Sequence, residues 1–361
     1  MSLIDPRVAK QAEIIVDYSL KVKKGEKVVI IGGFESRPLI IAIYEMLIKK
    51  GASDIRVHFD SYEFVEIFYK YASETQIKYF PQIDMEEIKY VDCYIRIASP
   101  ANTRYLTNID ARKIAKRTSI LRPITDYRVE NTRWIVTRFP TEAQAQEADM
   151  SLSEYENFVF SAINKVDWEL KRKEQEKLKG IIDSTFWVHI VGEGTDLKLS
   201  IKGRKAENGD GRFNMPDGEV FTSVVENSTN GFITFTYPAI YLGKEFHNIR
   251  LEFKDGKVVK ADAEKGEGEL KKILDMDRGA RIIGEFGIGN NFQIKKFTKD
   301  ILFDEKIGGS IHLALGKGYK ETGSKNESAL HWDMIKDLRM GGEIWFDDKL
   351  VQKDGKWLIR L

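Results

Sequence analysis

The first 130 residues alternate between segments with helical spacing of apolar residues and short strand-like segments. Apolar positions three and four apart predict amphipathic helices over residues 6–21 and 37–50, the second ended by Gly51. A short apolar run over residues 27–31, which ends at Gly32-Gly33, predicts a buried strand, and three further strands are predicted over residues 54–59, 92–97 and 118–121. Because the predicted helices separate the strands, the pattern indicates βαβ units and a mostly parallel sheet.

Residues 141–179 are rich in Ala, Gln, Glu and Lys and predict a helix in two pieces, broken near Ser151. Ser153 and Glu156 have the spacing of a capping box, which would begin the second piece. This helical stretch precedes a change of pattern, and we therefore place a domain boundary near residue 175.

After Gly180 the pattern changes to strict alternation of apolar and polar residues, interrupted by turn signals such as Asp255-Gly256. Alternating strands joined by tight turns are typical of antiparallel sheets. We therefore expect an α/β N-terminal domain with a mostly parallel sheet over residues 1–175. An α+β, antiparallel-rich C-terminal domain should follow over residues 176–361.

The charges of the chain are almost balanced, with 57 Lys and Arg against 56 Asp and Glu. A general nucleic-acid binder usually carries a basic surplus, so we expect no nucleic-acid partner. No apolar stretch reaches the roughly 18 residues of a transmembrane helix, so we expect no membrane association. A single cysteine, Cys93, permits no intrachain disulfide, which is typical of a cytoplasmic protein.

The five histidines differ in their surroundings. Three of them lie where a structural role is the simpler interpretation: His58, His189 and His247. His312 differs because it alternates with apolar residues and shares its strand face with Ala314 and Gly316, which leave space beside the imidazole. This segment alone leaves a bound ligand and a satisfied core histidine equally open.

His331 and Asp333 stand two residues apart in a predicted strand, so their side chains lie on the same face. An imidazole beside a carboxylate suits either a metal site or a His–Asp catalytic pair. A catalytic pair needs a nucleophile, but no G-x-S-x-G motif occurs and Cys93 lies in a predicted buried strand. The pattern therefore favours metal ligands.

A hydrolytic site with two metal ions needs several carboxylates, at least one of them shared. Glu285 stands between small residues in an otherwise apolar strand, where a carboxylate needs a compensating cation or donor. Glu219 begins an apolar segment after a turn, and Glu305 precedes the Gly308-Gly309 turn. Each acid alone would be taken for a surface charge. Their proximity in sequence to both unusual histidines favours a metal centre.

Three segments closely resemble the thermophilic aminopeptidase family, also called leucyl aminopeptidase type T or aminopeptidase S. They are Asn214-x-Pro-x-Gly-Glu-Val-Phe-Thr222, Ile301-Leu-Phe-Asp-Glu-Lys-Ile-Gly-Gly-Ser-Ile-His-Leu-Ala-Leu-Gly316 and His331-Trp-Asp333. The opening segments Asp5-Pro-Arg-Val8 and Asp17-Tyr-Ser-Leu-Lys-Val-Lys-Lys-Gly25 are also similar to this family. The resemblance thus covers nearly the whole chain.

The resemblance implies an exopeptidase with two divalent metal ions, zinc, cobalt or similar, that acts on peptides with a free N-terminus. It further implies a cytoplasmic homodimer. The metal ligands that it implies are Glu219, Glu285, His312, His331 and Asp333, with Glu285 bridging both ions. Tyr319 matches a tyrosine that lines the site and could donate a hydrogen bond to the oxyanion. Glu305 matches a glutamate near the metals that serves either as a ligand or as a general base.

Two other functions remain consistent with the sequence. The turn Gly32-Gly33 between a strand and a helix could hold the phosphate of a nucleotide or cofactor, with the later acids merely structural. Against this interpretation, the turn matches neither phosphate-binding glycine motif, and Glu35 would repel a phosphate. The other alternative is a non-catalytic peptide-binding module that keeps the metal fold. Amide hydrolysis that a chelator abolishes would separate both from an aminopeptidase.

Overall fold

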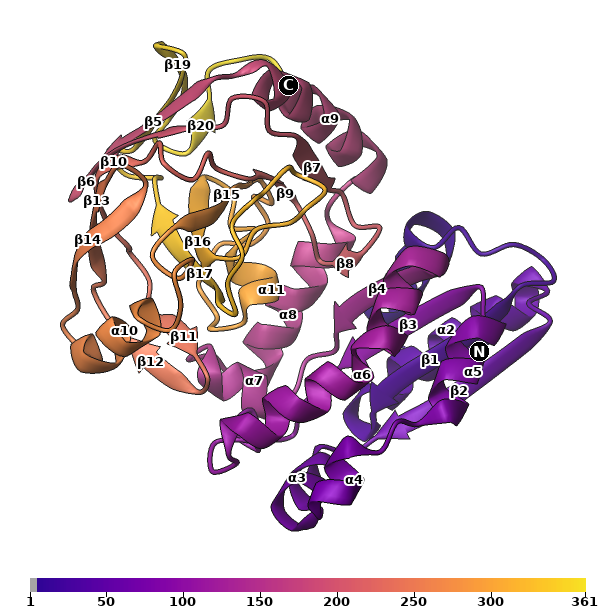
Figure 1. Cartoon of the computed structure of the whole chain (residues 1–361). Helices are drawn as coiled ribbons and strands as arrows, with labels where there is room; N and C mark the ends of the chain where they lie inside the picture. The colour runs from indigo at the N-terminus through magenta and orange to yellow at the C-terminus, as the bar shows by residue number, and fades with distance from the viewer. Residues whose placement is uncertain (1–4) are drawn as a thin grey trace. The chain divides into compact units, whose positions relative to one another are not determined.

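The computed structural model describes residues 5–361, and these divide into two compact units (Figure 1). The first unit contains the described residues up to Val166 together with Gly211–Pro216. The second contains Asp167–Asp210 and Asp217–Leu361. Helix α9 (Trp168–Ser184) begins the second unit. The predicted domains, 1–175 and 176–361, stay a prediction.

The first unit contains a five-stranded, fully parallel sheet with the strand order β2-β1-β3-β4-β8. Its strands are β1 (Lys27–Gly33), β2 (Asp54–Asp60), β3 (Cys93–Ala98), β4 (Arg133–Arg138) and β8 (Asn214–Met215). Three of the four predicted strands are confirmed, as β1, β2 and β3, and so is the parallel arrangement. Residues 28–30 of β1 are buried on both faces of the sheet, which explains why this strand reads as a continuous apolar run.

The helices of this unit precede or connect the strands of the sheet. They are α1 (Pro6–Glu13), η1 (Ile14–Ser19), η2 (Phe34–Ser36), α2 (Arg37–Lys50), α3 (Tyr62–Tyr71), α4 (Glu74–Lys78), α5 (Gln82–Tyr90), α6 (Ala111–Asn131), α7 (Glu142–Glu147) and α8 (Leu152–Asn164). Helix α2 has the predicted bounds, and Gly51 ends it with a φ of 79°, which a residue with a side chain rarely adopts. The predicted first helix continues from α1 as the π-helical η1.

The predicted strand at residues 118–121 is wrong. These residues lie inside α6, which begins where the Asp110 side chain accepts a hydrogen bond from the Arg112 amide. The fourth long strand of the sheet is instead β4, which follows α6 directly. The error arose because a segment of only four residues, Thr-Ser-Ile-Leu, fits one helical turn as well as it fits a strand.

The helical stretch after residue 141 has three pieces, α7, α8 and α9, and not the predicted two. The capping box lies two residues earlier than predicted. Ser151 and Glu154 form it at the start of α8, each accepting a hydrogen bond from the other's backbone amide. Both Ser-x-x-Glu pairs have the right spacing, and the position at which the chain turns decides which one caps the helix.

The second unit is built from antiparallel strands, as predicted. An eight-stranded sheet has the order β14-β13-β10-β6-β5-β18-β19-β20, a five-stranded sheet has the order β17-β16-β15-β9-β7, and β11 pairs with β12. The strands are β5 (Trp187–Gly192), β6 (Thr195–Ser200), β7 (Ala206–Gly209), β9 (Glu219–Thr222), β10 (Asn230–Thr234), β11 (Ala239–Tyr241), β12 (Lys244–Phe246), β13 (Arg250–Lys254), β14 (Lys257–Asp262), β15 (Ile283–Gly289), β16 (Ser310–Gly316), β17 (His331–Asp337), β18 (Glu343–Phe346), β19 (Lys349–Lys353) and β20 (Lys356–Trp357). Two short helices, α10 (Glu267–Leu274) and α11 (Ile301–Asp304), complete the unit.

One apolar core joins the two larger sheets of the second unit. The eight-stranded sheet contributes residues such as Ile190 and Leu197, and the five-stranded sheet contributes Phe286, Leu313 and Met334. Because side chains alternate along a strand, the residues between these point to the opposite face of the five-stranded sheet. That opposite face carries the polar residues described next.

Among residues 5–361, no helix combines the length and the apolar character that crossing a membrane requires.

Candidate metal centre

The register of the five-stranded sheet brings predicted ligands from three adjacent strands together. Strand β16 lies between β15 and β17. Its Ala314 lies opposite Glu285 of β15 on one side and opposite Asp333 of β17 on the other. His312 stands two residues before Ala314 and therefore points to the same face, opposite Gly287. The two acids thus flank a small residue, and the imidazole lies beside them.

A glycine makes room for this imidazole. A Cβ atom on Gly287 would lie 2.0 Å from Cε1 of His312, far inside van der Waals contact. The His312 ring therefore extends across β15, where its Nε2 lies 3.2 Å from Oε1 of Glu285. The sequence indicated that small residues of the same strand leave space beside His312. In the structure, the residue that makes room for the imidazole is Gly287 of the neighbouring strand.

The first donor group consists of Glu285, His312 and Asp333, whose ligand atoms all lie within 4.8 Å of one another. His331 extends this group, because its Nε2 lies 3.3 Å from Oδ2 of Asp333. The other ring nitrogen of His331, Nδ1, is 2.7 Å from the backbone oxygen of Lys317. A proton on Nδ1 would make that hydrogen bond and leave Nε2 available as a ligand.

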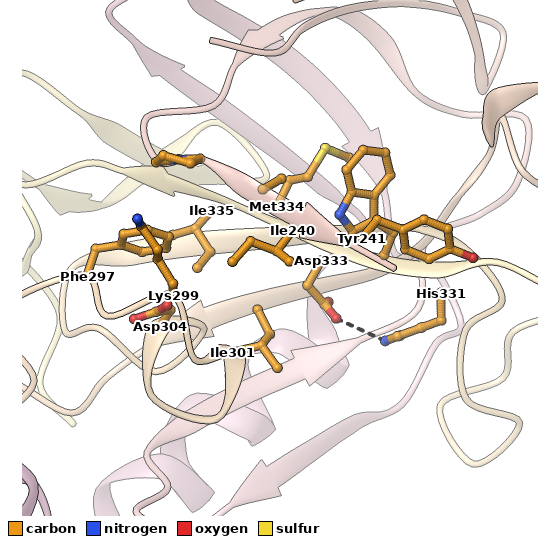
Figure 2. Close-up of a pocket in the computed structure, with 13 residues that line it drawn as sticks. Ile240, Tyr241, Phe297, Lys299, Ile301, Asp304, His331, Asp333, Met334 and Ile335 are labelled. Carbon is orange, nitrogen blue, oxygen red and sulfur yellow. Dashed lines mark ion pairs between the residues drawn. The ribbon is translucent and has the colours of Figure 1, made fainter. Parts of the chain in front are cut away.

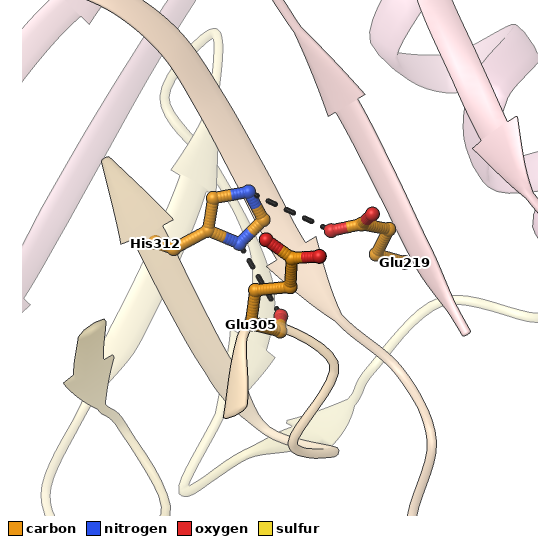
Figure 3. A group of neighbouring side chains, drawn as sticks. All are labelled: Glu219, Glu305 and His312. Atoms are coloured by element: carbon orange, nitrogen blue, oxygen red, sulfur yellow. Dashed lines mark hydrogen bonds and ion pairs between the residues drawn. The ribbon is translucent and has the colours of Figure 1, made fainter. Parts of the chain in front are cut away.

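The second donor group consists of Glu219, Glu305 and the same His312, again within 4.8 Å (Figure 3). Glu219 is the first residue of β9, and Glu305 follows α11 directly. His312 Nε2 lies 3.6 Å from Oε2 of Glu219, and its Nδ1 lies 3.2 Å from the backbone oxygen of Glu305. His312 therefore stands between the two groups.

The donor atoms suit a divalent cation. Three carboxylates each have a buried oxygen without a hydrogen-bond partner in the described structure: Oε2 of Glu219, Oε2 of Glu285 and Oδ1 of Asp333. Buried polar atoms are almost always paired, so three orphaned acceptors in one place indicate an absent partner of positive charge. Carboxylate and imidazole ligands are those that zinc and similar ions take in hydrolytic sites.

The pKa shifts of the site residues also favour a bound cation. Burial raises the pKa of Glu219 to about 8 and also raises that of Glu285. Burial opposes the charged form of His312 as well, but its hydrogen bond to Glu285 and the charge of Glu219 raise its pKa to about 10. Burial also opposes the charged form of His331, but its hydrogen bond to Asp333 and the charge of Asp333 raise its pKa to about 10. In the metal-free chain, protons on the histidines thus compensate carboxylates that a cation would otherwise neutralise.

Lys306 is a component of the site that the sequence did not indicate. Its side chain is completely buried, with Nζ 3.3 Å from Oε1 of Glu219 and in contact with the Glu305 carboxylate. Burial opposes its charge, but Glu219 and Glu305 raise its pKa above the ordinary lysine value. In the sequence, a lysine after two acids is most simply a surface residue. Its place inside the Ile301–Gly316 segment was the only available signal.

Tyr319 lies in the loop after β16 with about half of its surface exposed. Its ring centroid is 5.7 Å from that of His331, in an edge-to-face contact, and 5.5 Å from that of Phe221. Burial, and then the charge of nearby carboxylates led by Glu285, raises the pKa of its hydroxyl. The hydroxyl therefore stays protonated, as a hydrogen-bond donor must.

The three histidines expected to be structural belong to neither donor group. Each is paired with a carboxylate elsewhere: His58 with Glu87, His189 with Asp196 and His247 with Glu245. All seven predicted site residues lie around the two donor groups, whereas the function of each stays a prediction.

A cavity of about 170 Å³ adjoins the site in the second unit (Figure 2). Figure 2 shows His331 and Asp333 at one end of it and Phe297 and Lys299 at the other. The lining is mainly apolar and consists of Pro238, Ala239, Ile240, Tyr241, Phe297, Lys299, Ile301, Asp304, His331, Trp332, Asp333, Met334 and Ile335.

An antiparallel sheet that gathers carboxylates and histidines in this way is typical of proteins with a metal centre. Comparison with known families gives a more specific result: the family of thermophilic metalloproteases, M29, matches residues 4–357. The chain belongs to this family. The predicted family is confirmed, as is the enzyme class at the level of a metalloprotease, and such a protease requires a divalent metal ion.

Two curated relatives match the chain over all or nearly all of their length. Aminopeptidase AmpS of Bacillus subtilis (strain 168) is 26% identical, over 99% of this chain and 100% of the relative. Aminopeptidase 2 of Geobacillus stearothermophilus is also 26% identical, over 99% of this chain and 96% of the relative.

Two solved structures share the fold. Wild-type AmpT from Thermus thermophilus superposes with a TM-score of 0.85 at 22% identity, covering 98% of this chain and 99% of the other. The 2,5-dihydroxypyridine dioxygenase of Pseudomonas putida KT2440 has a TM-score of 0.60 at 13% identity, covering 97% of this chain and 96% of the other. The predicted fold class is confirmed. Since proteins named for different reactions share the fold, the site has to carry the functional argument.

Proposed function

We propose that this M29 metalloprotease is an aminopeptidase that removes N-terminal residues from peptides with the help of two divalent ions. The observation that carries the proposal is the pair of donor groups that meet at His312, together with their three buried carboxylate oxygens that lack a hydrogen-bond partner in the described structure. The aminopeptidase names of the full-length relatives support the choice of reaction.

The residues divide between two ion positions. Glu285, His312, His331 and Asp333 would hold one ion, and Glu219 and Glu305 would hold the other. Glu285 is suited to bridge both ions, because its Oε1 faces His312 while its Oε2 has no partner in the described structure. We assign Glu305 as a ligand because its carboxylate lies within 4.8 Å of the ligand atoms of Glu219 and His312.

Ions bound in this way supply Lewis-acid chemistry: they lower the pKa of water and polarise the scissile carbonyl. The protein's own groups would fix the geometry of the reaction. Strands of one sheet hold the ligands rigidly, so little reorganisation is needed during the reaction. Tyr319 would donate its hydroxyl hydrogen to the oxygen that becomes negatively charged when the carbonyl is attacked. Such a donor acts mainly in the transition state.

The cavity beside His331 and Asp333 is the place that we propose for the side chain of the substrate's N-terminal residue. A dry apolar cavity of about 150 Å³ is large enough to bind benzene. The present cavity, at about 170 Å³, would therefore accept a leucine or phenylalanine side chain. Lys299, at the other end of the cavity, is already paired with Glu245 at 3.3 Å, so its charge is compensated within the protein.

A peptide with a free N-terminus and the same peptide with an acetylated N-terminus test the proposal. We expect the metal-loaded protein to release the N-terminal residue of the free peptide only, and we expect a chelator to abolish the reaction. Equal cleavage of both peptides would indicate an endopeptidase. Metal binding without any cleavage would support a peptide-binding module, and retention on a nucleotide matrix without a metal requirement would support the nucleotide-binding alternative.

The assembly and location of the protein are proposals of the same kind. We propose a cytoplasmic homodimer that uses zinc or cobalt. Light scattering on the purified protein would test the dimer, and elemental analysis would identify the metal.

A further inference from the structure

The two donor groups differ in their cationic neighbours. Among residues 5–361, Glu285 and Asp333 form ion pairs with histidines, and no lysine or arginine side chain pairs with either acid. In the second group, Lys306 pairs with both Glu219 and Glu305. A lysine side chain therefore lies in direct contact with the carboxylates of one ion position and not with those of the other.

The Lys306 side chain is enclosed by the protein and is held next to Glu219 and Glu305. Its side chain has no solvent exposure. Its backbone is held on both sides, since its amide donates to Phe303 at 3.0 Å and its carbonyl accepts from Asn291 at 3.0 Å. A surface lysine could swing into water when an ion arrives, but this ammonium has to stay close to any cation that Glu219 and Glu305 bind.

His312 cannot serve both positions. Its Nδ1 is engaged with the backbone oxygen of Glu305, so Nε2 is the nitrogen left to bind an ion. One imidazole nitrogen ligates one ion. Nε2 lies closer to Glu285, at 3.2 Å, than to Glu219, at 3.6 Å. If the first group takes Nε2, the second position is left with carboxylates that already share a buried ammonium.

We infer that Lys306 makes the two ion positions unequal. This inference rests on the proposed two-ion function. The position of Glu285, His312 and Asp333 fills first and tightly. The position of Glu219 and Glu305 binds its ion weakly, because the fixed ammonium repels a second cation and already neutralises part of the carboxylate charge. The occupancy of this second position should then depend on the metal concentration, whereas the first position stays filled.

Calorimetric titration of the metal-stripped full-length protein with Zn²⁺ tests the inference directly. We expect two binding events whose Kd values differ by about 100-fold or more. In the variant Lys306→Met, the weaker Kd should tighten by about tenfold or more because the repulsion is removed, while the tighter Kd changes little. Cobalt spectroscopy during the same titration would report the ligand environment that fills first, independently of activity.

Two matched variants serve as controls. Lys306→Arg keeps the positive charge and should keep the second Kd weak. Lys353→Met removes a lysine of the same unit that pairs with Glu343 and not with either donor group, so it should leave both Kd values unchanged.

The outcomes separate this inference from the proposed function. Two Zn²⁺ ions of equal affinity in the wild-type protein would overturn the inference alone, even if Lys306→Met failed to fold. A folded Lys306→Met protein with an unchanged or weaker second Kd would also overturn it. A wild-type protein that binds no Zn²⁺ would instead refute the proposed function, on which the inference rests.

Discussion

In the five-stranded sheet of the second unit, one face buries apolar side chains and the other buries polar ones. On one face, Phe286 and Leu313 pack against the eight-stranded sheet in a shared apolar core. On the other face of the same strands, Glu285 and His312 are equally inaccessible to water. Burying apolar groups stabilises the fold, whereas burying charges costs free energy unless each charge is compensated. We therefore attribute the buried polar face to the chemistry of the site and not to the stability of the fold.

This contrast predicts that substitutions on the two faces have opposite effects. Changes on the polar face should remove metal and activity with little loss of stability. Changes on the apolar face should lower stability and leave the metal in place. The following experiments test this separation, beginning with the largest expected effect.

Glu285→Gln should lose one or both ions and nearly all activity, because a neutral amide is a poor bridging ligand. Metal content after gel filtration and turnover of an unblocked peptide would be measured together. Glu267→Gln, at an exposed glutamate of α10 paired with Lys271, is the matched control and should behave as wild type. Full metal content and full turnover in Glu285→Gln would refute the bridging function.

Gly287→Ala should have an effect almost as large through a residue without any ligand atom. The added Cβ would lie 2.0 Å from the His312 ring, so the imidazole has to leave its position across β15. We expect a folded protein with weakened metal binding and activity reduced about 100-fold or more, in line with losses from misplaced catalytic groups. Unchanged metal affinity would show that His312 does not need this position.

Tyr319→Phe should retain the ring, the fold and the metal but lose the hydroxyl donor. Losing one oxyanion donor typically lowers kcat by about 10²–10³-fold, or roughly 2.7–4 kcal/mol. KM should change little, because the ground state does not use this bond. Wild-type kcat together with full metal content would leave Tyr319 as a packing residue against His331.

Leu313→Ala tests the apolar face, directly beside His312 in the sequence. Leu313 is completely buried in the shared core. Its truncation should lower the free energy of unfolding by about 2–5 kcal/mol, from lost apolar contact and a residual cavity. Metal content and kcat at moderate temperature should stay close to wild type. Loss of metal at unchanged stability would contradict the separation of the two faces.

The sequence predicted the architecture where local pattern and tertiary environment agree. The strand-like segments at residues 27–31, 54–59 and 92–97 became β1, β2 and β3, and alternation of period two became the antiparallel sheets. The run at 118–121 failed because four residues are too few to distinguish a strand from a turn of α6. The Ser153 capping box failed because its spacing also fits Ser151, two residues earlier.

The candidate site, too, could be predicted only where its residues form a local sequence pattern. The His331-x-Asp333 spacing and an acid among apolar residues at Glu285 were visible as local patterns, and strand register then brought these residues together. Lys306 was not visible, because its burial depends on the fold of the whole unit. Nor was Gly287, since its contact with His312 crosses between strands.

The most direct test of the account is the metal content of the purified full-length protein before and after dialysis against a chelator, with peptide cleavage measured on each sample. We predict about two divalent ions per chain when metal is supplied. We further predict loss of N-terminal cleavage on removal of the metal and its return when Zn²⁺ or Co²⁺ is added back. Undiminished cleavage by a protein shown to contain no divalent metal would contradict the account.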